Sequence, residues 1–120
     1  MSEIADPAAL ARRYVELSNE ARLDEALAMF APDADYASSQ VGTFVGVAEI
    51  EAMMRAFFGR FASPHWEVAE YVQVGDDAAE FAFVMTATGP DGTQVERRGI
   101  ERIAFDAGGR ITRVDVDVAG

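Results

Sequence analysis

Residues 78–106, AAEFAFVMTATGPDGTQVERRGIERIAFD, contain the pattern that decides the fold. In the first half, Phe81, Phe83 and Met85 alternate with smaller or polar residues, and this period of two predicts a strand with one buried face. The tetrapeptide Gly-Pro-Asp-Gly at 89–92 is a turn signal, because proline and glycine supply the backbone angles that tight turns require. We therefore expect two long antiparallel strands on either side of this turn.

The same period continues outward from this hairpin. We place its two strands at 78–88 and 93–106, and turn signals at 75–77 and 107–109 predict two further strands, at 65–74 and 110–119. Four consecutive strands form an antiparallel meander in the simplest arrangement. Because sheets twist, strands of this length curl, and one face of the sheet becomes concave.

The residues before the meander show helical spacing instead. Asp6 and Pro7 are an N-cap followed by a first-turn residue, and they predict a helix over 7–19 with Tyr14 on its inner side. A second short helix is indicated by apolar residues three and four positions apart, and we expect Pro32 to end it. The residues with this spacing are Leu23, Ala26, Leu27 and Phe30.

A third helix is predicted after Gly46, and Ser63 and Pro64 should end it. Its apolar stripe is core that can also line a cavity, since methionine side chains adapt to irregular spaces. The stripe consists of Ile50, Met53, Met54, Phe57 and Phe61. Between the second and third helices, residues 36–44 suit a short irregular strand pair.

Helices first and a meander afterwards predict an α+β fold. We expect a curved antiparallel sheet wrapped around three N-terminal helices, in a single domain that spans residues 1–120. An apolar pocket should lie between the concave face and the helices. Trp66 shares its parity with Val68, so it too should point inward.

Composition restricts the partners and cofactors of the chain. Ten basic against 21 acidic residues give a net charge of −11, which repels phosphates, so we expect neither nucleic acid nor membrane as a partner. The absence of cysteine excludes thiolate chemistry, and a lone His65 cannot form a multi-histidine metal site. Met1–Pro7 lacks the basic start and apolar run of an export signal, which favours a cytoplasmic location.

Glu101 is the most informative polar residue. It shares its parity with Ile103 and Phe105, so its carboxyl group is predicted to point into the apolar interior, where it must be paired, hydrogen-bonded or protonated. Arg97 has the same parity, and an ion pair between the two is an equally simple outcome. The valines of the last strand send Asp117 to the other face, although Ile111 breaks that alternation and indicates a bulge. Asp117 therefore remains a candidate.

Two segments, YVEL at 14–17 and LDEALAMFAPDA at 23–34, resemble the nuclear-transport-factor-two-like superfamily, which includes ketosteroid isomerases and SnoaL-like polyketide cyclases. The similarity continues through Gly46 with its helix and through Gly108–Ile111, and it covers nearly the whole chain. The superfamily is expected to have a cone-shaped pocket that serves isomerases, cyclases, dehydratases, epoxide hydrolases and non-enzymatic binding proteins. The resemblance therefore specifies the fold better than the activity.

The resemblance also implies roles for particular residues. Tyr14 matches the oxyanion-hole tyrosine of the isomerases, and Glu101 matches their protonated carboxylic acid. Ser38 stands where those enzymes have a general-base aspartate, and serine cannot take a proton unaided at neutral pH. Another carboxylate, Glu70 or Asp117, would have to act as the base. Arg97 with Glu101 matches only part of the aspartate–arginine–aspartate set of the epoxide hydrolases.

Two functional hypotheses follow. The first is an isomerase, cyclase or dehydratase that needs no cofactor and acts on an apolar, polycyclic or carbonyl compound, with Tyr14 and Glu101 stabilising an enolate. The alternative is a non-enzymatic ligand-binding or dimeric assembly domain. The residues expected to contact the ligand are Trp66, Met54, Phe57, Phe83, Arg97 and Val116.

The outer face of the sheet suggests a protein partner. Ala82, Val84 and Ile100 have the parity opposite to the core and place apolar side chains on that face. A homodimer through this face is expected. A role as an accessory subunit, with the same face against a larger protein, would use these residues equally well.

Overall fold

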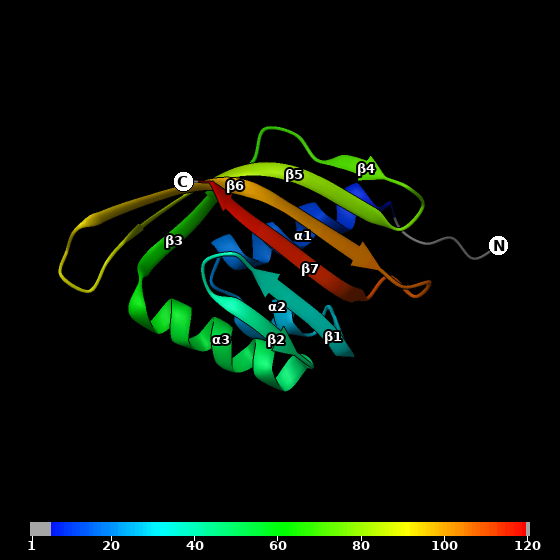
Figure 1. Ribbon diagram of the computed structural model, residues 1–120, viewed down its shortest axis with the longest axis horizontal. Helices are drawn as coiled ribbons and strands as arrows, with labels where there is room; N and C mark the ends of the chain where they lie inside the picture. Colours follow the sequence, from blue (N-terminus) through cyan, green and yellow to red (C-terminus); the bar gives the residue numbers. More distant parts are fainter. Residues whose placement is uncertain (1–5, 120) are drawn as a thin grey trace.

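A seven-stranded sheet curves over three helices in the computed structural model, which describes residues 6–119 (Figure 1). The elements are α1 (Pro7–Asn19), α2 (Leu23–Leu27), β1 (Phe30–Ser38), β2 (Gly42–Val45), α3 (Val47–Arg60), β3 (Ala62–Glu67), β4 (Val72–Val74), β5 (Ala78–Thr88), β6 (Gln94–Phe105) and β7 (Ile111–Ala119). The predicted α+β fold is confirmed. Most of Met1–Pro7, on which the cytoplasmic expectation rests, lies outside the described residues.

The strand order is β2-β1-β7-β6-β5-β3, and β4 pairs with a second part of β5. The antiparallel meander from β3 to β7 is as predicted. One pair differs from the prediction of a wholly antiparallel sheet, because β1 lies parallel to β7. This pair connects the N-terminal half of the chain to the last strand, and Figure 1 shows β1 and β7 side by side.

Helix α1 begins and ends where the sequence predicts. The Asp6 carboxylate accepts a hydrogen bond from the main-chain nitrogen of Ala8 at 3.1 Å, which caps the first turn. At the other end, the Asn19 side chain bonds both main-chain groups of Trp66, at 2.7 Å and 3.0 Å, and so fixes β3 against α1. None of the helices within residues 6–119 is long and apolar enough to cross a membrane.

The predicted second helix was too long. Helix α2 stops at Leu27, and Phe30 begins β1 opposite Ile111 of β7. The main-chain nitrogen of Ile111 donates to the Met29 oxygen at 2.7 Å, so a distant strand competes successfully with the local helical pattern. Pro32 lies in the irregular part of β1, where the ladder needs no N–H group.

The predicted end of the third helix was also wrong, as was the single strand over 65–74. Helix α3 ends at Arg60, and Ser63 and Pro64 belong to β3. Ser63 has a φ of 51°, and the register with β5 shifts there, so a bulge accommodates the proline. The strand then stops at Glu67 and resumes as β4 at Val72, further along β5.

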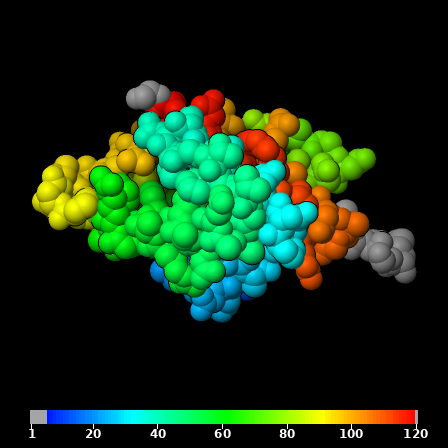
Figure 2. Space-filling model, turned by 60° about the horizontal axis from the view of Figure 1, so that its bottom comes forward, coloured from blue at the N-terminus to red at the C-terminus, as the bar shows by residue number. Residues whose placement is uncertain are grey.

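The inward parity predicted for the long strands is confirmed. Phe81, Phe83, Met85, Ile103 and Phe105 are all buried. The predicted bulge occurs at the start of β7, where the register shifts so that both Ile111 and Val114 are fully buried. Figure 2 shows that α3 and the β1–β2 hairpin lie beside each other and cover one face of the molecule.

Candidate functional site

An apolar cavity of about 90 Å³ lies between α1, α3 and the concave face of the sheet. It reaches the surface beside Gln40 and Val41, which are both exposed. A cavity of about 150 Å³ holds benzene, so a larger ligand would have to extend through this mouth or displace flexible side chains such as Met53. The lining comprises Tyr14, Val15, Ser18, Tyr36, Ser38, Gln40, Val41, Met53, Met54, Phe57, Phe58, Trp66, Phe83, Met85, Arg97, Glu101, Val116 and Val118.

The six residues predicted to contact a ligand all lie on this wall. Trp66 packs against Phe57 with ring centroids 5.9 Å apart, and Val116 comes from β7. Tyr14, Ser38 and Glu101 lie on the wall as well, so the structure brings together residues from both ends of the chain. Helix α1, the β1–β2 hairpin and β6 supply these three.

Asp117 and Glu70 are the exceptions. Asp117 is exposed on the outer face of the sheet, opposite Ile100, because its neighbours Val116 and Val118 occupy the inward positions of β7. Glu70 is exposed in the segment between β3 and β4. Neither carboxylate lines the cavity, so the expectation that one of them replaces the missing base is wrong. Glu101 is the sole carboxyl group among the described residues that line the cavity.

Glu101 lies in the middle of β6, between Phe81 of β5 and Val116 of β7. Its side chain is 5 % exposed. Within residues 6–119 its carboxyl group has no ion-pair partner and no hydrogen bond from a side chain or main-chain group. Burial raises the pKa of Glu101 from 4.5 to about 8, since removal from water penalises the charged form. At neutral pH Glu101 is therefore mainly a protonated acid, able to donate a hydrogen bond.

The ion pair between Arg97 and Glu101 does not form. The two residues are separated by Gly99, and the Arg97 guanidinium lies over the ring of Phe61, 5.3 Å from its centroid. Four residues of strand, about 13 Å, separate the main-chain positions of Arg97 and Glu101, and Arg97 also lines a hollow outside the cavity together with Gln40. The negative charge of Glu101 is suppressed by burial rather than balanced by a cation.

Two tyrosines stand in the same cavity as Glu101. Tyr14 is buried on α1 and packs edge-on against Phe30 at 5.7 Å. Its pKa is raised well above 10 by burial first, then by Tyr36 and Glu101. Burial, followed by the charge of Glu101, likewise raises the pKa of Tyr36 on β1. Both phenols therefore remain neutral hydroxyl donors over the physiological pH range.

Sequence reasoning missed Tyr36. The signal was available, since Tyr36 and Ser38 are two residues apart on one strand and must share a face. Ser38 itself has a local structural role: its hydroxyl oxygen accepts from the main-chain nitrogens of Gln40 at 3.2 Å and Val41 at 3.3 Å. Those bonds hold the β1–β2 turn at the mouth, and a serine so engaged is not a base.

Metal ligation has no support in the described residues. Between residues 6 and 119, no three histidine or acidic side chains come close enough together to hold an ion. His65 is exposed on β3 and does not line the cavity. The phenolic and ionisable side chains on the described cavity wall are those of Tyr14, Tyr36, Arg97 and Glu101.

The fold is shared with solved structures of low sequence identity. A nuclear-transport-factor-two-like protein of unknown function from Exiguobacterium sp. 255-15 is 16 % identical, with a TM-score of 0.83 over 92 % of this chain and 98 % of that one. SalBIII, an epoxide hydrolase/cyclase-like enzyme in pyran ring formation in the polyether salinomycin, is 17 % identical, with a TM-score of 0.83 over 92 % and 88 %. TerC, co-crystallised with polyporic acid, is 15 % identical, with a TM-score of 0.78 over 92 % and 90 %.

No curated protein matches the sequence. A family comparison does match it, over residues 11–114, and this range runs from α1 to the middle of β7. It includes most of α1, all of α2 and α3, strands β1 to β6 and most of the cavity wall. The chain therefore belongs to the SnoaL-like domain family, and it shares its fold with nuclear-transport-factor-two-like proteins.

Proposed function

We propose that this domain binds a small apolar molecule through an oxygen atom held at the inner end of the cavity by Tyr14, Tyr36 and Glu101. The observation that carries the proposal is the presence of three hydroxyl donors in one apolar cavity, none bonded to another protein group within residues 6–119. Among the described residues no fully buried side-chain oxygen lacks a hydrogen-bond partner, so these three oxygens face the cavity, where a ligand carbonyl or enol oxygen would accept from them. The aromatic wall would hold the rest of the molecule.

Three neutral donors around one oxygen favour negative charge on that oxygen, so the site suits a reaction that passes through an enolate or alkoxide. Reactions that begin with proton transfer to the ligand fit better than reactions that begin with proton abstraction, because the one carboxyl group is protonated at neutral pH. Isomerisation, cyclisation and dehydration remain the reaction classes, and no cofactor is needed for any of them.

Cyclisation agrees best with these groups. In an intramolecular epoxide opening, a hydroxyl of the ligand attacks one epoxide carbon while Glu101 gives its proton to the epoxide oxygen, whose bond to that carbon breaks and which stays in the molecule as a hydroxyl group. The attacking hydroxyl then loses its proton to the Glu101 carboxylate, so the acid is restored and the product is an isomer of the substrate. SalBIII, whose role is in pyran ring formation, and TerC, which holds polyporic acid, support a cyclic oxygenated ligand.

A non-enzymatic binding protein is the second candidate, and the position of Ser38 favours it. Its hydroxyl holds the β1–β2 turn where a general base would otherwise stand. Such a protein would use the same three donors to orient the ligand. A compound that binds and is recovered unchanged after long incubation with the protein would distinguish this candidate from the enzyme.

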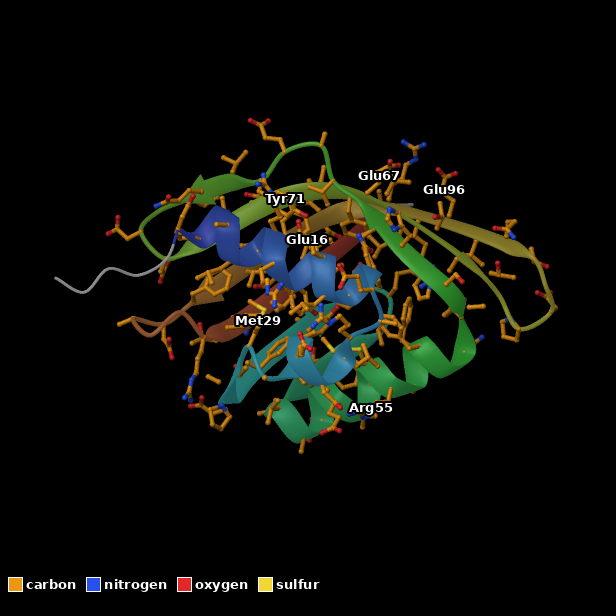
Figure 3. The ribbon with its side chains drawn as sticks, turned by 180° about the vertical axis from the view of Figure 1, so that it is seen from behind. Glu16, Met29, Arg55, Glu67, Tyr71 and Glu96 are labelled. Atoms are coloured by element: carbon orange, nitrogen blue, oxygen red, sulfur yellow. The ribbon has the colours of Figure 1, made fainter. Side chains whose placement is uncertain are left out.

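Removal of either cavity tyrosine hydroxyl should weaken the binding of a ligand with an oxygen atom. We expect 2-naphthol to raise the melting temperature more than naphthalene does, and Tyr14→Phe and Tyr36→Phe each to weaken 2-naphthol about fivefold, for one hydrogen bond of roughly 1 kcal/mol. Calorimetric titration gives the dissociation constants. The control is Tyr71→Phe, because Tyr71 packs on Phe81 outside the cavity, beside α1 (Figure 3).

Equal affinity for 2-naphthol and naphthalene in the wild-type protein would contradict the role of the donors. Stabilisation by hydrophilic charged metabolites alone would contradict the apolar cavity as the ligand site.

We also propose a homodimer through the outer face of the sheet. Ile100 is 49 % exposed there, Ala82 is exposed beside it, and the ion pair of Arg102 with Glu80 borders them. A face that carries both signs of charge around an apolar centre is complementary to a second copy of itself when the two are related by a twofold axis.

A charge placed at the centre of this face should separate the subunits. Light scattering at tens of micromolar should give the mass of a dimer for the wild-type protein and of a monomer for Ile100→Glu. Val45→Glu, at an equally apolar exposed position on β2, should stay dimeric. A monomeric wild-type protein over the whole concentration range would disprove this interface.

A further inference from the structure

We infer that the mouth of the cavity contains an anion-binding subsite built on Arg97, and that the ligand is an apolar molecule with a carboxylate or similar anionic group at the end opposite its bound oxygen. This inference rests on the proposed binding function and specifies the class of ligand. It depends on Arg97, on the aromatic groups around it and on its distance from Glu101.

The charge surroundings of Arg97 are unusual for this chain. All ten positively charged residues are arginines. Six of them pair with carboxylates, namely Arg13, Arg22, Arg55, Arg98, Arg102 and Arg113. Arg97 has no carboxylate within 4.0 Å among residues 6–119, although acidic residues outnumber basic ones by two to one. It is also the one cationic side chain in the described part of the cavity wall.

The Phe61 ring holds two guanidinium groups. The Cζ atom of Arg97 lies 5.3 Å from the ring centroid, and the Cζ atom of Arg60 lies 5.6 Å from it. Each cation is attracted by the ring, but two like charges on one ring repel each other. Arg60 is also attracted by the C-terminal end of α3, where it is the last residue, whereas Arg97 on the sheet has no such dipole. An anion at the mouth would relieve the repulsion and leave Arg97 stacked in place.

The surroundings of Arg97 suit a planar anionic group. Sheet register puts Trp66, Met85 and Arg97 in one row on the concave face, so an aromatic ligand could lie on this row with its charged group at the guanidinium. The Arg97 guanidinium lies over the Phe61 ring and has no hydrogen bond to another described side chain, so its N–H groups remain available for a bidentate contact. Gln40 and Val118 line both the cavity and a shallow hollow outside it, together with Arg97, so the subsite is continuous with the surface.

The spacing along β6 sets the length of the ligand. Four residues separate Arg97 from Glu101, which is about 13 Å of strand before curvature. Between them the ring of Phe83 packs directly on Gly99, so a ligand that reaches both groups would lie across this ring, which lines the cavity. A molecule of two rings, with an oxygen at one end and a carboxylate at the other, would span the two groups.

The test uses three probes of one shape: 4′-hydroxybiphenyl-4-carboxylic acid, its methyl ester and 4-hydroxybiphenyl. Calorimetric titration at pH 6.5 should give the acid at least tenfold tighter binding than the neutral ester. Arg97→Gln should abolish that preference and leave the ester unchanged. Arg113→Gln is the control, because it removes the same charge from an ion-paired residue of β7 that lines neither the cavity nor the hollow, and it should preserve the preference.

The possible failures are distinguishable. Equal binding of acid and ester by the wild-type protein, or equal weakening of both by Arg97→Gln, would overturn the subsite and leave the cavity as a ligand site. No binding of any probe would overturn the subsite together with the proposed function. If Arg97→Gln does not fold, the wild-type preference for the acid should still fall as sodium chloride is added, and a preference insensitive to salt would overturn the proposal.

Discussion

Replacement of Glu101 by glutamine should stabilise the protein by about 4 to 5 kcal/mol at pH 9 and change its stability little at pH 4. The folded pKa of about 8 lies above the ordinary value of 4.5, so the folded state binds a proton that the unfolded state has released over this range. The contribution of this proton to the free energy of unfolding is therefore complete below pH 4.5, and it decreases as the pH rises toward 8. The loss is about 1.4 kcal/mol per unit over roughly 3.5 units.

Glutamine keeps the shape of the side chain and cannot ionise, so the variant should not show this decrease. Urea unfolding of both proteins from pH 4 to pH 9 measures the difference, which should grow with pH and level off above 8. Glu96→Gln is the control, since Glu96 is exposed on the same strand and lies on the outer side of the sheet with Glu67 (Figure 3). A difference independent of pH would mean that Glu101 is charged in the folded protein.

The protonated form also connects stability with binding. Below its pKa Glu101 is a hydroxyl donor, and above it the carboxylate would repel a ligand oxygen that carries negative charge. A protein selected for stability alone would gain by placing an apolar residue at this position in β6. The stability lost by burying an acid at this position thus has a physical reason if the carboxyl group acts on a ligand.

Local periodicity correctly predicted the type of element and its inward residues where one face of the element packs on the core. Helix α1 and strands β5 and β6 are of this kind, and their inward residues were correctly predicted, Glu101 included. Prediction failed where a distant strand decides the local structure. Phe30 has helical spacing with Leu27, yet it begins a strand because β7 offers a parallel partner, Ile111, 81 residues away in sequence.

For the candidate site, too, local periodicity predicted which residues face inward, but it did not predict contacts that depend on other elements. Parity could place Tyr14 and Glu101 inside, but it could not tell whether Arg97 reaches Glu101, because that depends on the direction of a long side chain and on Phe61 from another element. Asp117 was wrongly retained as a candidate because the sequence cannot fix how a bulge at Ile111 shifts the rest of β7. Tyr36 was missed because its strand was expected to be short and irregular.

Addition of a single methyl group at Gly99 should damage both the sheet and the cavity. A Cβ atom at this residue would lie 2.5 Å from the main-chain oxygen of Asp117 on β7 and 2.9 Å from Cζ of Phe83. Both are closer than non-bonded atoms tolerate, so β7 or the Phe83 ring must move. We expect Gly99→Ala to destabilise the protein by about 1 to 3 kcal/mol and to weaken 2-naphthol, because Phe83 lines the cavity.

A matched glycine separates this effect from the general consequences of the substitution. Gly59 lies in α3 with no atom within 4 Å of an added Cβ, so Gly59→Ala should stabilise the protein by about 0.5 to 1 kcal/mol. Urea unfolding compares the two variants. If the ring is the main obstacle, the double variant Gly99→Ala/Phe83→Leu should recover part of the stability, whereas obstruction by the Asp117 oxygen would leave it unimproved. A Gly99→Ala protein with wild-type stability and affinity would contradict the close contact of β6 with β7 and Phe83.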